Sequence, residues 1–336
     1  MKLSWEASGL ALREPLRISR SVMAEREAVT ITAEHAGVAG RGEVVTSAYY
    51  ELDVPRIEAE LEAARRDLDG VAPSRALVAA LPAESPGVRA GLDAALHDLV
   101  AELRGVPVHE LVGVAPREPV PTARTIGITP AADAAAAAAD LAGRGFRVLK
   151  IKLGRAADEL ARVAAIRAAV PDARLLLDPN GAWIPEEASR MLRAAAEFDV
   201  EAVEQPIAPG TPDLLAEVAE ASPIPVIADE DARSAADVRL LGPRVHGVNV
   251  KLPECGGIRA AREIIDTARG FGVEVMLGCQ VASSLGIAPA VHLSGLARWV
   301  DLDGHLLLAR DPWTGLGGED GLLRIAGSTG LGVRPS

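Results

Sequence analysis

Acidic and lysine side chains follow short apolar runs in the second half of this sequence, and together they could do chemistry. Asp178 lies in LLLDPN, Glu204 in VEAVEQP and Asp229 in PVIADE. Lys152 in RVLKIKLG precedes the three acids and Lys251 in VNVKLP follows them. Three carboxylates brought together repel one another, and a hard divalent cation such as Mg²⁺ or Mn²⁺ relieves that repulsion. The pattern therefore predicts a metal site formed by the three acids, with a lysine on each side.

The spacing of these residues indicates which elements position them. From Lys152 to Asp301, polar residues at the ends of successive apolar runs are 26, 26, 25, 22, 28 and 22 residues apart. Each interval is about the length of one strand, one helix and two loops. The run TARTIGI, residues 122–128, adds a first strand and brings the number of βα steps to eight. We therefore predict an α/β fold with a TIM-type (β/α) barrel, whose strands end at the face where active sites lie.

The N-terminal part of the chain has a different pattern. Residues 1–50 alternate apolar and polar side chains between glycines, which predicts an antiparallel meander. A helix is predicted from Ser85-Pro86 to Gly105, with an apolar stripe of Leu92, Leu96, Leu99 and Leu103. We divide the chain into an α+β capping domain over residues 1–117, a barrel over 118–311 and a C-terminal segment over 312–336.

Composition excludes several classes of protein. The chain has 336 residues, 49% of them hydrophobic and 24% charged, as in ordinary globular proteins. Its net charge of −12 disfavours nucleic acid or an anionic membrane as a partner, so we expect a small-molecule substrate. No run is long and apolar enough for a membrane helix or a signal peptide, which predicts a cytoplasmic protein. Its two cysteines lack C-x-x-C spacing, so a thiolate zinc site is not expected. The sequence leaves open whether the chain forms a homo-oligomer.

The positions of the three lysines on their strands predict where their side chains point. Side chains two apart on a strand leave the same face, so Lys150 and Lys152 should point together. Strands two and six of an eight-stranded barrel lie on opposite sides, so Lys152 and Lys251 should face each other across the metal. A substrate carboxylate bound to the cation would then place its α-carbon between two amines, which suits α-proton abstraction. We expect the cation and neighbouring ammonium groups to lower the lysine pKa values, so that a neutral amine can act as base.

These motifs resemble the enolase superfamily, its muconate-lactonizing subgroup and, within that, dipeptide epimerases of the L-Ala-D/L-Glu type. The resemblance rests on K-I-K at 150–152, D-P-N-G-A-W with Asp178, E-Q-P with Glu204, A-D-E with Asp229, and Lys251 followed by Gly256-Gly257. It implies a magnesium-dependent enzyme with an N-terminal cap to which the C-terminal segment returns. It further implies that Lys152 and Lys251 are the acid/base pair and that Lys150 is a fixed positive charge beside the substrate carboxylate.

The same resemblance implies substrate contacts. In VDLDGHLLL, Asp301 and Asp303 share one face of the eighth strand, and this D-x-D is similar to the aspartate pair that receives the substrate's α-ammonium group in dipeptide epimerases. A D-x-D-G run can also simply end a strand in a turn. Thr125 on the first strand is implied to touch the substrate. Arg20, in ISRSVMAER, is implied to lie in a cap loop near the side chain of the epimerised residue, where an acidic side chain would suit it.

One segment departs from the family pattern. Many relatives carry L-G-C-M-x-E-S-S after the seventh strand, whereas this chain has LGCQVASS, with Gln280 for Met and Ala282 for Glu. The departure leaves the identity of the dipeptide open.

The leading hypothesis is a dipeptide epimerase that inverts the C-terminal α-carbon by two-lysine 1,1-proton transfer through an enediolate. The alternatives are a cycloisomerase or lyase of the muconate cycloisomerase or o-succinylbenzoate synthase type, an N-acylamino acid racemase, and a non-catalytic carboxylate-binding protein. Asp301 and Asp303 favour the epimerase over the cycloisomerase or lyase, whose substrates carry no ammonium group.

Overall fold

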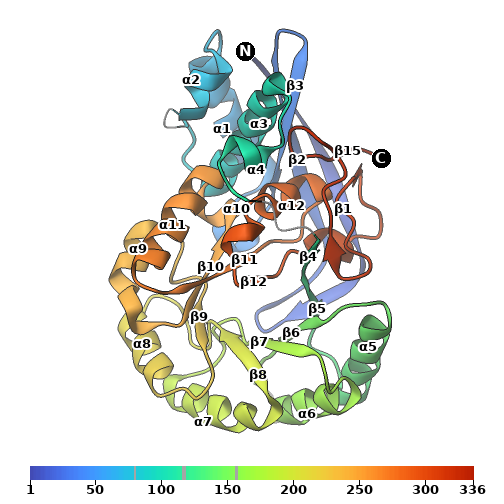
Figure 1. Ribbon diagram of the computed structural model, residues 1–336, viewed down its shortest axis with the longest axis vertical. Helices are drawn as coiled ribbons and strands as arrows, with labels where there is room; N and C mark the ends of the chain where they lie inside the picture. The colour runs from blue at the N-terminus through green and yellow to red at the C-terminus, as the bar shows by residue number, and fades with distance from the viewer. Residues whose placement is uncertain (79–80, 116–118, 156–157) are drawn as a thin grey trace.

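The computed structural model describes residues 1–78, 81–115, 119–155 and 158–336, and it consists of an α+β cap above a parallel barrel (Figure 1). The predicted boundary between residues 117 and 118 lies outside the described residues. Both termini lie at the cap end of the molecule (Figure 1). In the described part of the chain, every helix is too short or too polar to cross a lipid bilayer.

The cap is built on three antiparallel strands, as the alternating pattern of the first 50 residues predicts. Strands β1 (Lys2–Ile18), β2 (Ser21–His35) and β3 (Val38–Val45) pair in chain order. The helices that follow are α1 (Val54–Leu68), α2 (Pro73–Val78), α3 (Pro86–Arg104) and α4 (Val108–Leu111). Helix α3 packs directly against β3. The approach is so close that a Cβ added at Gly40 or Gly42 would lie 2.1 Å from the α3 backbone. Only glycine permits this approach.

Helix α3 confirms most of the predicted helix and corrects two details. It begins after Ser85 and ends at Gly105, whose φ of 68° is the left-handed conformation of a helix C-terminus. The Ser85 hydroxyl does not cap the helix but donates to Glu60 of α1 at 2.5 Å. Leu103, in the last turn of α3, is 42% exposed and lies outside the buried stripe. The stripe that is buried against the cap strands comprises Leu92, Leu96 and Leu99.

The barrel contains eight parallel strands that pair in chain order, which confirms the predicted fold class. They are β5 (Ala123–Ile126), β6 (Val148–Lys152), β7 (Arg174–Asp178), β8 (Val200–Glu204), β9 (Val226–Ala228), β10 (Gly247–Lys251), β11 (Glu274–Gly278) and β12 (Trp299–Val300). The helices between them are α5 (Ala131–Gly143), α6 (Glu159–Ala169), α7 (Pro185–Ala195), α8 (Pro212–Glu220), α9 (Ala235–Leu241), α10 (Leu252–Cys255), α11 (Ile258–Gly270) and α12 (Ser284–Val291). Helices α5 to α9 and α11 form the outer ring (Figure 1).

The barrel interior is filled by one apolar layer below the strand ends. It comprises Ala123, Val148, Leu176, Ala202, Ile227, Met276 and Trp299. Gly247 of β10 leaves room for the Trp299 ring, which would lie 2.8 Å from a Cβ there. The first and last strands meet through side chains: Leu302 N–H donates to Thr122 Oγ1 at 2.9 Å, and Thr125 N–H donates to Asp303 Oδ2 at 2.7 Å. These bonds hold the strand ends of β5 and β12 together.

The C-terminal segment returns along the barrel to the cap. Its strands β13 (Trp313–Thr314) and β15 (Arg334–Pro335) pair with each other, and β14 (Leu322–Leu323) pairs with β4 (Val120–Pro121). Leu331 N–H then donates to Asp98 of α3 at 2.7 Å, and the Thr329 hydroxyl donates to Glu102 at 2.9 Å. The segment therefore joins the end of the chain to the main cap helix.

Candidate active site

Lys150 lies at the centre of a ring of carboxylates at the carboxyl ends of the strands. Its Nζ is 3.0 Å from Asp178 Oδ2, 2.6 Å from Glu204 Oε2 and 2.7 Å from Asp301 Oδ2. The side chain is almost completely buried. An ammonium group can be buried this deeply because three carboxylates compensate for its lost hydration.

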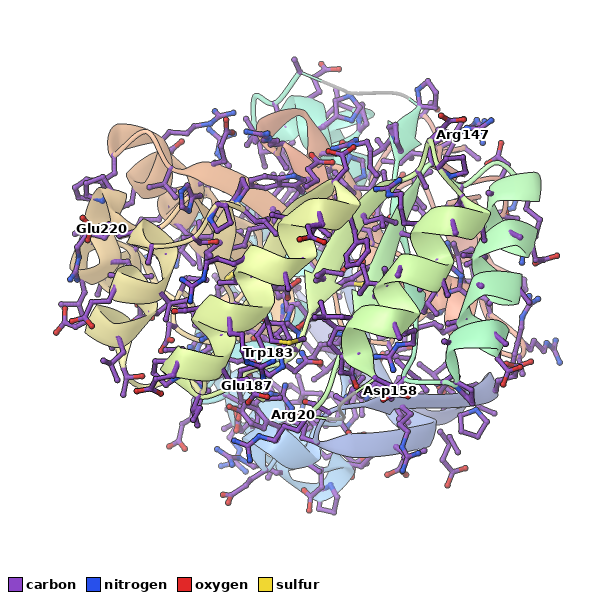
Figure 2. The ribbon with its side chains drawn as sticks, turned by 90° about the horizontal axis from the view of Figure 1, so that it is seen from below. Arg20, Arg147, Asp158, Trp183, Glu187 and Glu220 are labelled. Carbon is purple, nitrogen blue, oxygen red and sulfur yellow. The ribbon has the colours of Figure 1, made fainter. Side chains whose placement is uncertain are left out.

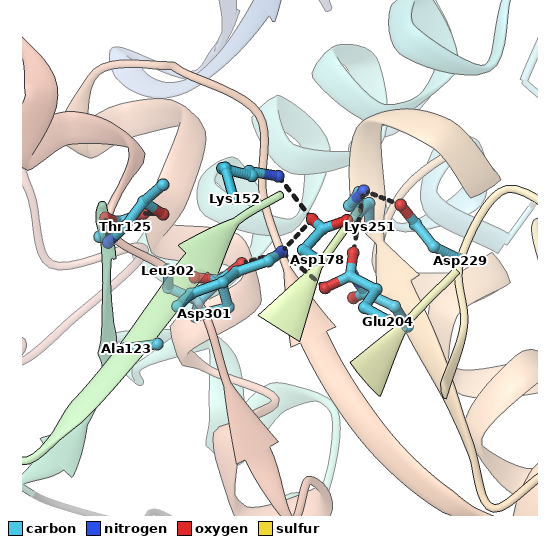
Figure 3. Close-up of polar contacts among 12 residues, drawn as sticks. Ala123, Thr125, Lys152, Asp178, Glu204, Asp229, Lys251, Asp301 and Leu302 are labelled. Carbon is cyan, nitrogen blue, oxygen red and sulfur yellow. Dashed lines mark hydrogen bonds and ion pairs between the residues drawn. The ribbon is translucent and has the colours of Figure 1, made fainter. Parts of the chain in front are cut away.

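Lys152 and Lys251 lie closer to solvent and contact different carboxylates of this end of the barrel (Figure 3). Lys152 Nζ donates to Asp178 Oδ2 and Lys251 Nζ donates to Asp229 Oδ2, both at 2.5 Å. Their strands, β6 and β10, are four positions apart in the eight-stranded order and so lie on opposite sides of the barrel. Each side chain remains 12% exposed. The structure therefore brings the two predicted acid/base residues together as the spacing predicts.

Neighbouring carboxylates raise the pKa values of Lys150 and Lys251. Burial alone would lower the pKa of Lys251, but the charges of Asp229, Glu254 and Glu204 outweigh it and hold the pKa well above its usual range. The same balance of burial against carboxylates raises the pKa of Lys150. In this arrangement carboxylates surround the ammonium groups of Lys150 and Lys251, whereas the expected lowering of pKa depends on a bound cation and stays a prediction.

Asp178, Glu204 and Asp229 are fully buried, and their charges are unevenly balanced. Burial and the charges of Glu230 and Glu254 raise the pKa of Asp229 to about 7, although Lys251 opposes this. Burial and the charge of Asp178 raise the pKa of Glu204. Asp178 is the opposite case, since the ammonium groups of Lys150 and Lys152 outweigh burial and hold its pKa far below the usual range. The lysines therefore do not fully neutralise the carboxylates at this end of the barrel, and a further cation would stabilise their charged forms.

The donor atoms fit a hard cation. All three predicted ligands offer carboxylate oxygens, and the buried Oδ1 of Asp229 has no hydrogen-bond partner. Within the described ranges, no three acidic, histidine or cysteine side chains already converge on one point as a metal site, because the three carboxylates turn towards lysines. A bound cation would therefore take over oxygens that now accept from ammonium groups. Its residues would be Asp178, Glu204 and Asp229.

Asp301 and Asp303 both lie at the barrel mouth and have different partners. Asp301 Oδ2 accepts from Lys150, and its buried Oδ1 has no hydrogen-bond partner. Asp303 Oδ2 accepts from Thr125 N–H at 2.7 Å and from Arg124 Nη1 at 3.0 Å. The Thr125 hydroxyl is 3.4 Å from Asp303 Oδ1, so the two predicted substrate contacts also contact each other.

Arg20 lies in the turn between β1 and β2, where the cap approaches the barrel (Figure 2). Its Nη1 donates to Glu230 Oε1 at 2.7 Å, and its guanidinium lies 4.4 Å from the centre of the Tyr49 ring. Arg20 therefore reaches the site as predicted, but its charge is already paired with a carboxylate that follows β9.

A cavity of about 520 Å³ joins these groups beneath the cap. Pockets of this size commonly hold small-molecule ligands. Its walls include all seven predicted catalytic and substrate-binding residues: Arg20, Thr125, Lys150, Lys152, Lys251, Asp301 and Asp303. Leu16, Ile18 and Met23 of the cap and Leu307 of the barrel supply apolar wall. The three acidic residues predicted to bind metal lie just behind the lysines.

Several polar residues of the site were not predicted. Asn180 donates through its backbone to Asp178, and Asn249 Nδ2 donates to Glu204 Oε1 at 2.9 Å. Asn249 lies two residues before Lys251 on β10, so the period of the strand already placed it on the same face. Glu254 accepts from Tyr50 of the cap at 2.7 Å and lies 3.9 Å from Lys251. No pattern in the sequence joins Tyr50 to Glu254, because that pairing depends on how the cap docks.

Two family models together match most of the chain. The mandelate racemase/muconate lactonizing enzyme N-terminal domain matches residues 4–113, and the enolase C-terminal domain-like family matches residues 132–336. The chain therefore belongs to the mandelate racemase and muconate-lactonizing branch of the enolase superfamily, which confirms the resemblance seen in its motifs.

Individual relatives share one kind of activity. A hydrophobic dipeptide epimerase of Roseobacter litoralis is 36% identical over 99% of this chain and 98% of its own. An L-Lys-D/L-Arg epimerase of Methylococcus capsulatus is 37% identical over 77% of this chain and 75% of its own. The crystal structure of a dipeptide epimerase from Enterococcus faecalis, complexed with Mg and L-Leu-L-Tyr, superposes with a TM-score of 0.92 at 29% identity, covering 99% and 98% of the two chains.

Proposed function

We propose that this protein is a magnesium-dependent dipeptide epimerase that inverts the C-terminal α-carbon of its substrate by a two-lysine 1,1-proton transfer. The observation that carries the proposal is the placement of Lys152 and Lys251 on opposite sides of one cavity, with three carboxylates behind them. Two bases on opposite faces of a carbon can remove a proton from one face and return one to the other.

Asp178, Glu204 and Asp229 would hold the magnesium ion. When bound, the ion supplies positive charge for the substrate carboxylate and for the enediolate that forms when the α-proton leaves. Lys150 adds a fixed positive charge beside the same group, since its three carboxylate partners keep it protonated. A cation bound by Asp178 and Asp229 would compete with Lys152 and Lys251 for these carboxylates, freeing the two amines to carry protons.

Asp301 and Asp303 support a dipeptide rather than another carboxylic acid. Both line the cavity, and Asp301 Oδ1 is a buried acceptor without a hydrogen-bond donor. An α-ammonium group would supply that donor and gain charge-assisted bonds in a sheltered site. The relatives named for dipeptides agree with this substrate class.

Incubation with Mg²⁺ and a panel of L,L-dipeptides in deuterated water tests the proposal. Deuterium is expected at the C-terminal α-position alone, together with the L,D-diastereomer, followed by NMR and mass spectrometry. If no dipeptide in the panel exchanges its α-proton, the proposal is wrong. Exchange at that position without a second diastereomer would retain the proton abstraction and reject the epimerisation.

A further inference from the structure

Arg26 differs from the other cationic side chains that line the cavity in its lack of a carboxylate partner among the described residues. Four have a carboxylate oxygen within 4.0 Å: Arg20, Lys150, Lys152 and Lys251. Arg26 of β2 forms no ion pair with any described residue. Its Nη1 donates only to two neutral oxygens, Gln280 Oε1 at 3.4 Å and the Val281 carbonyl at 3.3 Å. Both distances exceed the usual range for N–H···O bonds.

The surroundings of Arg26 compensate its charge only in part. The side chain is half-buried, and burial lowers its pKa to about 10 although the charge of Glu254 opposes this. The carboxylate of Glu254 already accepts from Tyr50 at 2.7 Å and from Gln280 Nε2 at 3.3 Å. A partly desolvated guanidinium without a close anion gains strongly when an anion is supplied.

The position of Gln280 places Arg26 near one end of the substrate. Gln280 follows β11, and a Cβ at Gly304 would lie 2.3 Å from the Gln280 carbonyl oxygen. The loop that contacts Arg26 therefore packs against the residue next to Asp303. Under the proposed function, Asp301 and Asp303 receive the α-ammonium group of the dipeptide. Arg26 then lies at the end of the cavity that holds the N-terminal residue of the substrate.

We propose that Arg26 binds a carboxylate on the side chain of the substrate's N-terminal residue, so that the preferred dipeptides begin with Glu or Asp. A guanidinium and a carboxylate pair in a two-bond fork, which a neutral side chain cannot match. Gln280 acts as a positioning residue, because its Nε2 donates to Glu254 and so its Oε1 is turned towards Arg26. The inference rests on the proposed function and adds the substrate class.

Substrate preference tests this inference without any variant. The rate of α-deuterium exchange is measured for L-Glu-L-Leu, L-Gln-L-Leu, L-Lys-L-Leu and L-Leu-L-Glu with the Mg²⁺-loaded protein. We expect kcat/KM for L-Glu-L-Leu to exceed that for L-Gln-L-Leu by about 10- to 100-fold, as a charge-assisted bond allows, with L-Lys-L-Leu slowest. L-Leu-L-Glu carries its side-chain carboxylate at the other end and should react equally fast with the parent and with Arg26→Gln.

Variants assign the preference to Arg26. Arg26→Gln should reduce the Glu-to-Gln preference to within about threefold of unity, mainly through KM, and Arg26→Lys should retain part of it. Gln280→Met should reduce it less. Arg17→Gln, at an exposed position on β1 outside the cavity walls, is the matched control and should keep the parental preference.

The outcomes separate this inference from the function on which it rests. If L-Gln-L-Leu reacts as well as L-Glu-L-Leu, the role of Arg26 is overturned and the epimerase proposal stands. An unchanged preference in Arg26→Gln overturns it too. If no dipeptide exchanges at all, the proposed function itself fails.

Discussion

The barrel interior contains two layers that differ sharply although the same strands build both. Val148, Leu176 and Ile227 belong to the apolar layer, and two residues further along the chain lie Lys150, Asp178 and, just after β9, Asp229. Side chains two apart share a face, so each strand contributes to both layers. One layer is close-packed and uncharged. The other consists of buried charges that are individually costly and stable only as a set.

The difference between the two layers indicates which residues of this fold contribute to stability and which to chemistry. The apolar layer gains free energy from burial without needing particular partners. In the charged layer each group depends on its neighbours, as Lys150 does on its three carboxylates. We expect substitutions in the lower layer to change stability and substitutions in the upper layer to change activity.

The largest expected effect is on activity in the charged layer. Lys152→Met and Lys251→Met should each reduce kcat for epimerisation by about 10²- to 10⁴-fold, because each removes one of the two proposed proton carriers. Each variant should still exchange the α-proton of one diastereomer through the remaining lysine. Lys2→Met, at an exposed position on β1, is the matched control and should act as the parent does. Full epimerisation by either site variant would refute the two-base mechanism.

A substitution in the apolar layer should have the opposite profile. Leu176→Ala removes a buried side chain next to Trp299 and Met276 in the layer and should lower the free energy of unfolding by about 2–5 kcal/mol. Urea denaturation measures the loss, with Leu214→Ala, 40% exposed on α8, as the control expected to change little. A loss of kcat in folded Leu176→Ala as large as in the lysine variants would show that the two layers are not separable.

Glu43 shows what happens to a buried carboxylate without a lysine. Burial raises its pKa from 4.5 to about 7, although Ser283 donates to it through both its backbone N–H and its hydroxyl. The folded protein therefore holds this proton more tightly than the unfolded chain between pH 4.5 and 7, so stability falls as pH rises through that range, by up to about 3 kcal/mol. Glu43→Gln should remove this part of the pH dependence in thermal denaturation. Glu34→Gln, exposed on β2, should keep it, and an unchanged pH profile in Glu43→Gln would contradict the assignment.

The metal should stabilise the charged layer measurably. Mg²⁺ at about 100 times its dissociation constant should raise the free energy of unfolding by about 2.7 kcal/mol over the protein in EDTA, because it binds only the folded carboxylates. Asp229→Asn should lose most of this gain, whereas the exposed control Asp172→Asn should retain it. Differential scanning calorimetry with and without Mg²⁺ measures the stabilisation. If Mg²⁺ stabilises both variants equally, the ion binds elsewhere.

Much of the fold and the site could be predicted because their signals are local. The 25- and 26-residue spacing of Asp178, Glu204 and Asp229 follows from one strand and one helix per step, so it already places them on successive strands. The assignment of Leu103 to the apolar stripe was wrong, because helical period alone does not show how far along a helix its packing against other elements continues. The raised pKa of Lys251 could not be predicted from the sequence, because it depends on carboxylates such as Asp229 and Glu204 that come with other strands.

The sequence by itself determined the barrel, the cap strands and the residues at the strand ends, because side-chain period and element length are properties of neighbouring residues. Only the tertiary structure decided which charges pair: Arg20 with Glu230, Tyr50 with Glu254, and Arg26 with no carboxylate among the described residues. Arg20 and Arg26 lie six positions apart and look alike in the sequence. Docking of the cap on the barrel gives one a partner and leaves the other facing the cavity, since pair formation depends on distance in space.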